Sequence, residues 1–174
     1  MVGELADVSM RHPPRLKHTP AQAFHKTYHP LFFPKNSKNL TTVAVMREPI
    51  DWLGSWYRYR SRDALVGSEK STRDVSFDAF INAYLADERP AYADLGSQGR
   101  FLCGNGDVPK VDQIFDFTQL DRLRCFFEER LGRQLTLRPV NVSPKFELQL
   151  TTKTEARLRK ELAHDFALYE KIRQ

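Results

Sequence analysis

A short apolar run followed by a helical pattern stands out in the middle of the chain, in the stretch VAVMREPIDWLGSWYRYRSR. The apolar run predicts a buried strand over about residues 40–46. Pro49 predicts a turn into a helix, because proline fixes its own φ and suits the first helical position. Apolar residues then recur at roughly helical spacing, at Ile50, Leu53, Trp56 and Tyr57. The pattern predicts a strand–turn–helix unit with Arg47 at the carboxyl end of the strand, where the helix dipole favours an anion.

The region before this unit is rich in helix-start and helix-stop signals. Residues 15–18 are expected to end a small strand. Thr19 is expected to cap a helix over residues 20–28, because threonine accepts a backbone N–H and Pro20 suits the first turn. The dipeptide His29-Pro30 is expected to stop that helix. Leu31–Phe33 is apolar and expected to be buried.

The rest of the chain alternates polar loops with apolar-periodic segments. A polar loop over 63–74 precedes a helix capped by Ser76. We expect a strand over 111–117 and a last helix over 151–173. Between them, a helix is expected to begin at Thr118 or Gln119 and to end at Gly132. Its inward-facing residues are expected to be Leu120, Leu123, Phe126, Phe127 and Leu131. Helices that alternate with short strands predict an α/β domain.

Composition places the chain among globular proteins. Its 174 residues are enough for one domain with a sizeable core, and 41% of them are hydrophobic. The formal net charge is +5 and the isoelectric point about 9.3. This charge suits an anionic ligand, but without a dense basic run it is no signature of nucleic-acid binding.

Neither the cysteines nor the apolar segments point to secretion or to a membrane. Cys103 and Cys125 lack metal or redox spacing, so we expect free thiols in a reducing compartment. The first ten residues lack the apolar core of a signal peptide, and no window approaches a membrane span. We therefore expect a cytoplasmic protein without a membrane span.

The strand–turn–helix unit carries a family resemblance. Arg47-x-Pro49, followed by Ser55 and Tyr57, resembles the 3′-phosphate-binding element of sulfotransferases that use 3′-phosphoadenosine 5′-phosphosulfate (PAPS). The resemblance implies that Arg47 and Ser55 hold the 3′-phosphate of the donor. Arginine supplies a planar fork of donors that matches phosphate, and serine adds a neutral hydroxyl. The competing interpretation is a salt-bridged Arg47 at the strand end and a Ser55 that packs on the helix.

The resemblance extends, less specifically, over about residues 15–174. It implies a P-loop-NTPase-like three-layer sandwich with a short parallel sheet. The phosphate loop of the family, often Pro-Lys-Thr-Gly-Ser/Thr, has no counterpart, since 34–38 (PKNSK) and 67–71 (GSEKS) match it only in passing. We therefore expect a single sulfotransferase-like domain over 1–174, truncated at its N-terminus and missing its first strand.

The chemistry implied is transfer of a sulfuryl group from PAPS to a hydroxyl or amine of a small-molecule or carbohydrate acceptor. His18 is the candidate base, because an imidazole titrates in the useful range and this one precedes a helix start. Arg100 is a candidate phosphate contact. His25 and His29 share a helical spacing but lack a third ligand, so no metal is expected.

Two other functions compete with the enzyme. The first is a non-catalytic relative that binds the nucleotide or a partner without the phosphate loop. The second, ranked last, is a nucleic-acid binder that uses the basic helix end 58–62; it lacks interleaved aromatic platforms, so no nucleic-acid partner is expected. An unpaired sheet edge would favour association between copies.

Overall fold

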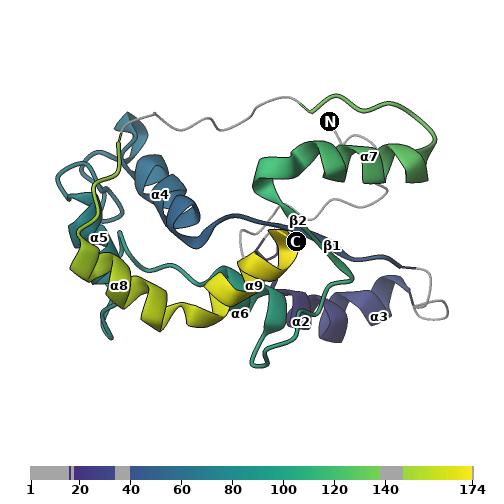
Figure 1. The fold of residues 1–174 in the computed structure, drawn as a ribbon, viewed down its shortest axis with the longest axis horizontal. Helices are drawn as coiled ribbons and strands as arrows, with labels where there is room; N and C mark the ends of the chain where they lie inside the picture. Colours follow the sequence, from purple (N-terminus) through teal and green to yellow (C-terminus); the bar gives the residue numbers. More distant parts are fainter. Residues whose placement is uncertain (1–15, 17, 34–39, 138–146, 174) are drawn as a thin grey trace. The chain divides into compact units, whose positions relative to one another are not determined.

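The computed structural model describes residues 16, 18–33, 40–137 and 147–173. It is α/β, as expected, and combines helices with a short parallel sheet (Figure 1). Its internal contacts fall into two compact units. The first unit comprises residues 1–46, 97–140 and 172–174, and the second comprises 47–96 and 141–171. Each unit is described by itself, and the expected single domain stays a prediction.

The sheet of the first unit consists, within the described residues, of two parallel strands. Strand β1 (Val43–Met46) pairs with β2 (Gln113–Asp116) in the register Val43 opposite Gln113. Both strands were expected, with longer bounds. Just before them, the N–H and Oγ1 of Thr42 each donate to Asp112 Oδ2 at 2.7 Å. These side-chain bonds fix the start of the ladder and leave only four paired residues on each strand.

Helix α7 (Leu120–Leu131) packs on β2 after a 3-10 turn, η5 (Phe117–Gln119). The rings of Phe115 and Phe126 lie 5.3 Å apart, edge to face. The helix ends at Gly132, whose φ of 62° is left-handed, as expected from its sequence. Leu131 is 43% exposed, so the expectation that it points inward is wrong. Twelve helical residues span about 18 Å and four strand residues about 13 Å, so the last turn of α7, which carries Leu131, extends beyond the end of the strands.

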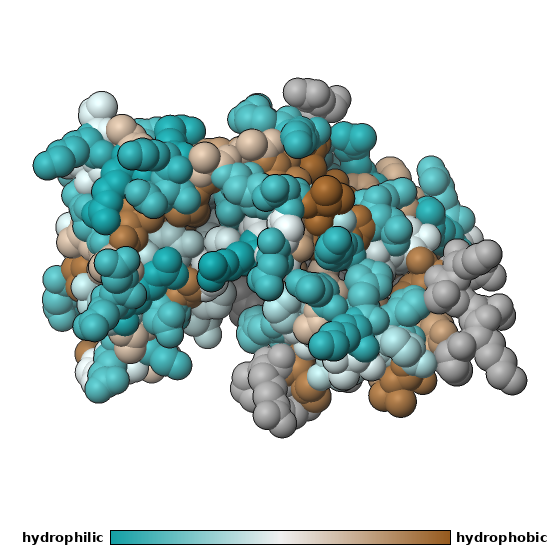
Figure 2. All heavy atoms as spheres, turned by 90° about the horizontal axis from the view of Figure 1, so that it is seen from below, coloured by the Kyte–Doolittle hydropathy of each residue, from teal (hydrophilic) through white to brown (hydrophobic). Residues whose placement is uncertain are grey.

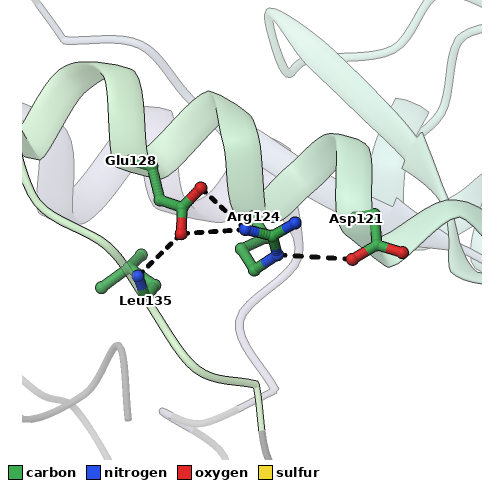
Figure 3. A network of polar contacts seen from close by, with 4 residues as sticks. All are labelled: Asp121, Arg124, Glu128 and Leu135. Carbon is green, nitrogen blue, oxygen red and sulfur yellow. Dashed lines mark hydrogen bonds and ion pairs between the residues drawn. The ribbon is translucent and has the colours of Figure 1, made fainter.

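One glutamate of α7 connects the segment after the helix back to it. Arg124 donates to Glu128 at 2.8 Å and to Asp121 at 3.3 Å, and the N–H of Leu135 donates to Glu128 at 2.8 Å (Figure 3). The Leu135 bond is the main cause that lowers the pKa of Glu128, followed by Arg124. A carboxylate on α7 therefore holds the chain after Gly132 in place.

The helical segment near the start continues beyond the expected stop. It comprises α2 (Ala21–Ala23), the π-helix η2 (Phe24–Tyr28) and α3 (His29–Phe32). In an α-helix the ring of Pro30 would meet the carbonyl four residues before it. Here the N–H of His29 bonds to Phe24 O, five residues back, and this wider turn accommodates the proline. The expected stop at His29-Pro30 is therefore wrong.

Two further expectations for this region are corrected. Leu16 is helical and His18 lies in a turn, not at the end of a strand. Thr19 Oγ1 donates to Leu16 O at 2.7 Å, so it stabilises that turn, and Pro20 is the N-cap residue of α2. The three residues Leu31–Phe33 are exposed, at 70%, 40% and 39%, because no described element covers the end of α3.

Helix α6 (Gln98–Cys103) was not predicted from the sequence. Ser97 caps it by accepting the N–H of Arg100, and it packs against α2. Both cysteines are free thiols, Cys103 buried on α6 and Cys125 exposed on α7. A short helix of six residues gives little periodic signal, so its existence depends on packing against α2.

The second unit is helical in the described part. It holds α4 (Pro49–Arg60), the 3-10 turn η4 (Asp63–Leu65), α5 (Phe77–Tyr84), α8 (Thr152–Glu161) and most of α9 (Ala163–Arg173). The core side chains Leu53, Phe80, Ile81 and Leu158 have no exposed area. Ser76 caps α5 as expected, whereas the single last helix expected over 151–173 is broken at Leu162.

Two polar anchors hold the second unit together. Asp78 on α5 accepts the N–H and Oγ1 of Thr151, each at 2.8 Å, and so ties the start of α8 to α5. Arg60 is only 8% exposed, and its guanidinium donates to the carbonyl of Ala91 at 2.9 Å. Burial lowers its pKa, which Asp94 partly offsets. Arg60 is therefore a structural residue and is not a surface cation of the basic helix end 58–62.

The surface is mixed in character. On the face drawn in Figure 2, hydrophilic side chains predominate and hydrophobic ones gather in separate patches. Among the helices that the structure describes, none has the length and apolar character needed to cross a bilayer. The expected compartment stays a prediction.

Candidate functional site

Arg47 lies at the turn between β1 and α4, directly before the helix. Pro49 occupies the first position of α4, as expected, which fixes the direction in which the chain leaves the strand. The Arg47 guanidinium is 23% exposed and donates through Nε and Nη2 to Asp51 Oδ2, at 2.8 and 2.5 Å. The salt bridge that the competing interpretation expected at Arg47 is therefore present.

Two carboxylates occupy the start of α4. Glu48 is the N-cap residue and accepts the N–H of Asp51 at 2.8 Å. Both carboxylates are favourable there, because the helix N-terminus carries partial positive charge. The Glu48 carboxylate already accepts the backbone N–H of Asp51. An anion that binds at the N-terminus of α4 must therefore use Arg47 and other donors beside these carboxylates.

Ser55 lies on α4 one turn after Asp51 and is half-buried. Residues four apart share one side of a helix. Arg47 binds Asp51, and Asp51 shares its side of α4 with Ser55, so the three residues follow one stripe. The resemblance implies that Arg47 and Ser55 act on one ligand, and that role stays a prediction. Asp51 was missed, although its four-residue step from Arg47 was a usable signal.

The aromatic residues of α4 surround this stripe. Tyr57 belongs to the core, its hydroxyl donates to Val75 O at 2.6 Å, and burial raises its pKa. Trp52 and Trp56 are half-buried and meet edge to face at 6.5 Å. Tyr59 is 42% exposed. Its ring meets that of Trp56 edge to face at 5.8 Å, so all four aromatic residues pack in the core or on the helix.

The other two candidate residues belong to the first unit. His18 is exposed in the turn before α2, and Arg100 is exposed on α6. Arg47 and Ser55 belong to the second unit. A role of His18 as base and of Arg100 as phosphate contact therefore stays a prediction.

The first unit also contains a cavity of about 430 Å³. Its lining is mainly apolar, with Phe24, Ala44 and Leu102 among the contributors, and His25 and Thr42 add polar groups. Its volume lies within the range of small-molecule pockets. No sequence pattern indicates it, because its walls come from four separate stretches of the chain.

Two histidines, His25 and His29, lie on the helical segment that contributes to this cavity, and His25 is part of its lining. His25 Nε2 lies 2.6 Å from Lys110 O, and the rings of His25 and His29 are 5.5 Å apart. A bond to a carbonyl requires that Nε2 carries the proton, which makes Nδ1 the basic atom of neutral His25. Among the described residues there is no group of three or more side chains placed to hold a metal ion.

Comparison of the chain with protein-family models, with curated proteins and with solved structures finds no match. The resemblance to sulfotransferases therefore depends on the residues of the chain itself, Arg47, Pro49, Ser55 and Tyr57, and on the turn that positions them.

Proposed function

We propose that the chain is a sulfotransferase-like protein that binds the 3′-phosphate of PAPS at Arg47 and Ser55. The observation that carries the proposal is the stripe on α4, with Arg47 held at the strand end by Asp51 and Ser55 one turn further along. The short parallel sheet, with β1 running into α4, supports the finer proposal of a P-loop-NTPase-like three-layer sandwich that lacks its first strand.

The Arg47–Asp51 pair is compatible with phosphate binding. A guanidinium carries five N–H donors, and the two bonds to Asp51 fix the orientation of its plane. Fixing that plane before the ligand arrives reduces the entropy lost on binding. The Ser55 hydroxyl adds a donor without charge, which offsets part of the repulsion between a phosphate and Asp51.

The stability of the fold gives little reason for this pair. Its two side chains are 23% and 45% exposed, and pairs of this kind contribute about 0–1 kcal/mol. The Arg47 guanidinium is therefore partly accessible beside its ion pair, which supports a role in ligand binding.

In the proposed reaction the acceptor oxygen or nitrogen forms a bond to sulfur while the bond from sulfur to the 5′-phosphate oxygen breaks. The acceptor proton passes to the base, for which His18 is the candidate, and 3′-phosphoadenosine 5′-phosphate leaves. Preorganised donors toward the transferring group are usually the largest catalytic contribution. The second candidate is a relative that binds the nucleotide without turnover.

Calorimetric titration of the chain with 3′-phosphoadenosine 5′-phosphate and with adenosine 5′-phosphate tests the proposal. The two ligands differ only in the 3′-phosphate, so the account predicts clearly tighter binding of the first. Equal affinity for both, or no binding of either, would contradict it. A parallel assay of sulfuryl transfer from PAPS to simple phenols and sugars then separates the enzyme from the binding-only relative.

A further inference from the structure

The end of α3 presents three consecutive apolar side chains to solvent. Leu31 is 70% exposed, Phe32 40% and Phe33 39%. Single exposed apolar residues are ordinary, whereas an adjacent group of this size marks an interaction surface. The π-helix causes the exposure, because it lets the helical segment continue past Pro30 and carry the three residues beyond the covered part of the unit. We call Leu31–Phe33 the apolar tip.

The sequence around the apolar tip is basic and lacks acids. Residues 8–47 contain seven Lys and Arg, four of the five histidines, and neither Asp nor Glu. The other 134 residues hold 20 basic and 22 acidic side chains, so the excess positive charge of the chain lies in this stretch. Within the described part, Lys26 is exposed on the same helical segment as the tip, and α6, which packs on α2, adds the exposed Arg100.

Acidic groups of the first unit do not cancel this charge at the tip. Asp112 interacts with His25, but its carboxylate already accepts two bonds from Thr42. The helix α7 carries the acids Asp121, Glu128 and Glu129, of which the first two bind Arg124 on that helix. The described segment 18–33 itself carries the exposed Lys26 and no acid, so an anionic surface that contacts the tip meets positive charge from this segment.

We propose that the apolar tip and Lys26 dock the protein on an anionic lipid surface. Apolar side chains beside basic ones form the usual interfacial anchor, in which apolar groups enter the headgroup boundary and cations pair with anionic lipids. A nucleic acid is a poorer fit. Phe32 and Phe33 could stack on bases, but the most exposed side chain of the tip is the aliphatic Leu31, which suits a lipid boundary and has no ring to stack.

The test is co-sedimentation of the full chain with phosphatidylcholine vesicles, with and without 30% phosphatidylserine, at low and at high salt. We expect binding to the anionic vesicles at low salt that weakens at least tenfold in the triple variant Leu31→Ser/Phe32→Ser/Phe33→Ser, because that variant loses the inserted groups. Lys26→Glu should weaken binding roughly tenfold, and added salt should remove the contribution of charge.

The first unit offers a matched control. Phe117, Leu131 and Leu137 are exposed to about the same degree as Phe32 and Phe33, at 40%, 43% and 39%, and belong to the segment around α7, whose three acidic and three basic residues balance. Their triple serine variant should bind vesicles as the unchanged chain does. Circular dichroism of all variants separates loss of binding from loss of the fold.

Four results would overturn the proposal. They are absence of binding to anionic vesicles at low salt, equal binding to neutral vesicles, an unchanged affinity in the tip variant, and an equal loss in the control variant. Titration with a 20-base single-stranded oligonucleotide covers the competing partner. The surface would be assigned to nucleic acid if Lys26→Glu abolishes oligonucleotide binding and the triple tip variant binds vesicles as the unchanged chain does.

Discussion

Arg47 donates two hydrogen bonds to a single oxygen of Asp51, from Nε at 2.8 Å and from Nη2 at 2.5 Å. Asp51 lies in the first turn of α4, and Ser55 follows it by one turn on the same side. The pair therefore aims the arginine along the helix side that carries the serine. It also means that any phosphate at Arg47 shares the guanidinium with a carboxylate.

Asp51→Asn should change the stability of the chain little. The ion pair is partly exposed, so we expect a loss of less than about 1 kcal/mol in the free energy of unfolding. Urea unfolding followed by tryptophan fluorescence measures this, because both tryptophans of the chain lie on α4. A loss well above that amount would make Arg47–Asp51 a structural pair and weaken the case for a ligand.

Ser55→Ala should lower the affinity for 3′-phosphoadenosine 5′-phosphate several-fold. A neutral hydroxyl donor contributes about 0.5–1.5 kcal/mol, less than a charged donor. The control is Ser61→Ala at the other end of α4, where the hydroxyl donates to Arg58 O. Calorimetry should give an unchanged affinity for the control variant. The same affinity loss in both variants would assign the effect to the helix and remove Ser55 from the site.

Phe80→Ala should destabilise the second unit by about 3–5 kcal/mol, because it removes a ring with no exposed area from the core. Tyr59→Ala, on a side chain that is 42% exposed, should cost far less. Urea unfolding of both variants compares the two costs. Similar small losses would show that the packing around Phe80 is looser than described.

The second unit should lose stability in acid through Asp78. The N–H of Thr151 is the main cause that lowers the pKa of this carboxyl below its ordinary value of 3.8, with hydroxyl bonds from Thr151 and Thr154 adding to it. A lowered pKa stabilises the folded state above the ordinary value, and that contribution disappears as the pH falls through the lower, folded-state value. Denaturation midpoints between pH 6 and 3, followed by tryptophan fluorescence, measure the loss.

Asp78→Asn is the matching variant for the acid experiment. It should be less stable than the unchanged chain at pH 6 and nearly equal to it in strong acid, because the amide cannot titrate. Parallel pH profiles for the two proteins would show that Asp78 does not contribute in this way.

The local signals in the sequence were reliable where one residue type fixes the backbone. Pro49 predicted the start of α4, Ser76 the cap of α5, and Gly132 the left-handed end of α7. The α/β class and the short parallel sheet followed from the two apolar runs around Val43 and Ile114. These features depend on neighbours a few residues away, which a sequence displays directly.

The features that the sequence did not show depend on distant partners. The helix α6 packs against α2, the cavity of the first unit combines four stretches, and the helical segment continues past Pro30 after the π-helix Phe24–Tyr28. For the candidate site, the resemblance implied Arg47 and Ser55, and only the structure showed that Arg47 donates both bonds to Asp51. His18 and Arg100 stay predictions, since nothing in the description of their unit assigns them to a nucleotide.

The most direct test of the central claim is calorimetric comparison of the unchanged chain with Arg47→Ala, each titrated with 3′-phosphoadenosine 5′-phosphate and with adenosine 5′-phosphate. A charge-assisted contact is worth about 1.5–3 kcal/mol, so we expect the variant to bind the first ligand roughly 10- to 150-fold more weakly. Binding of the second ligand should change little. An equal loss for both ligands, or the same affinity in both proteins, would remove Arg47 from the 3′-phosphate site.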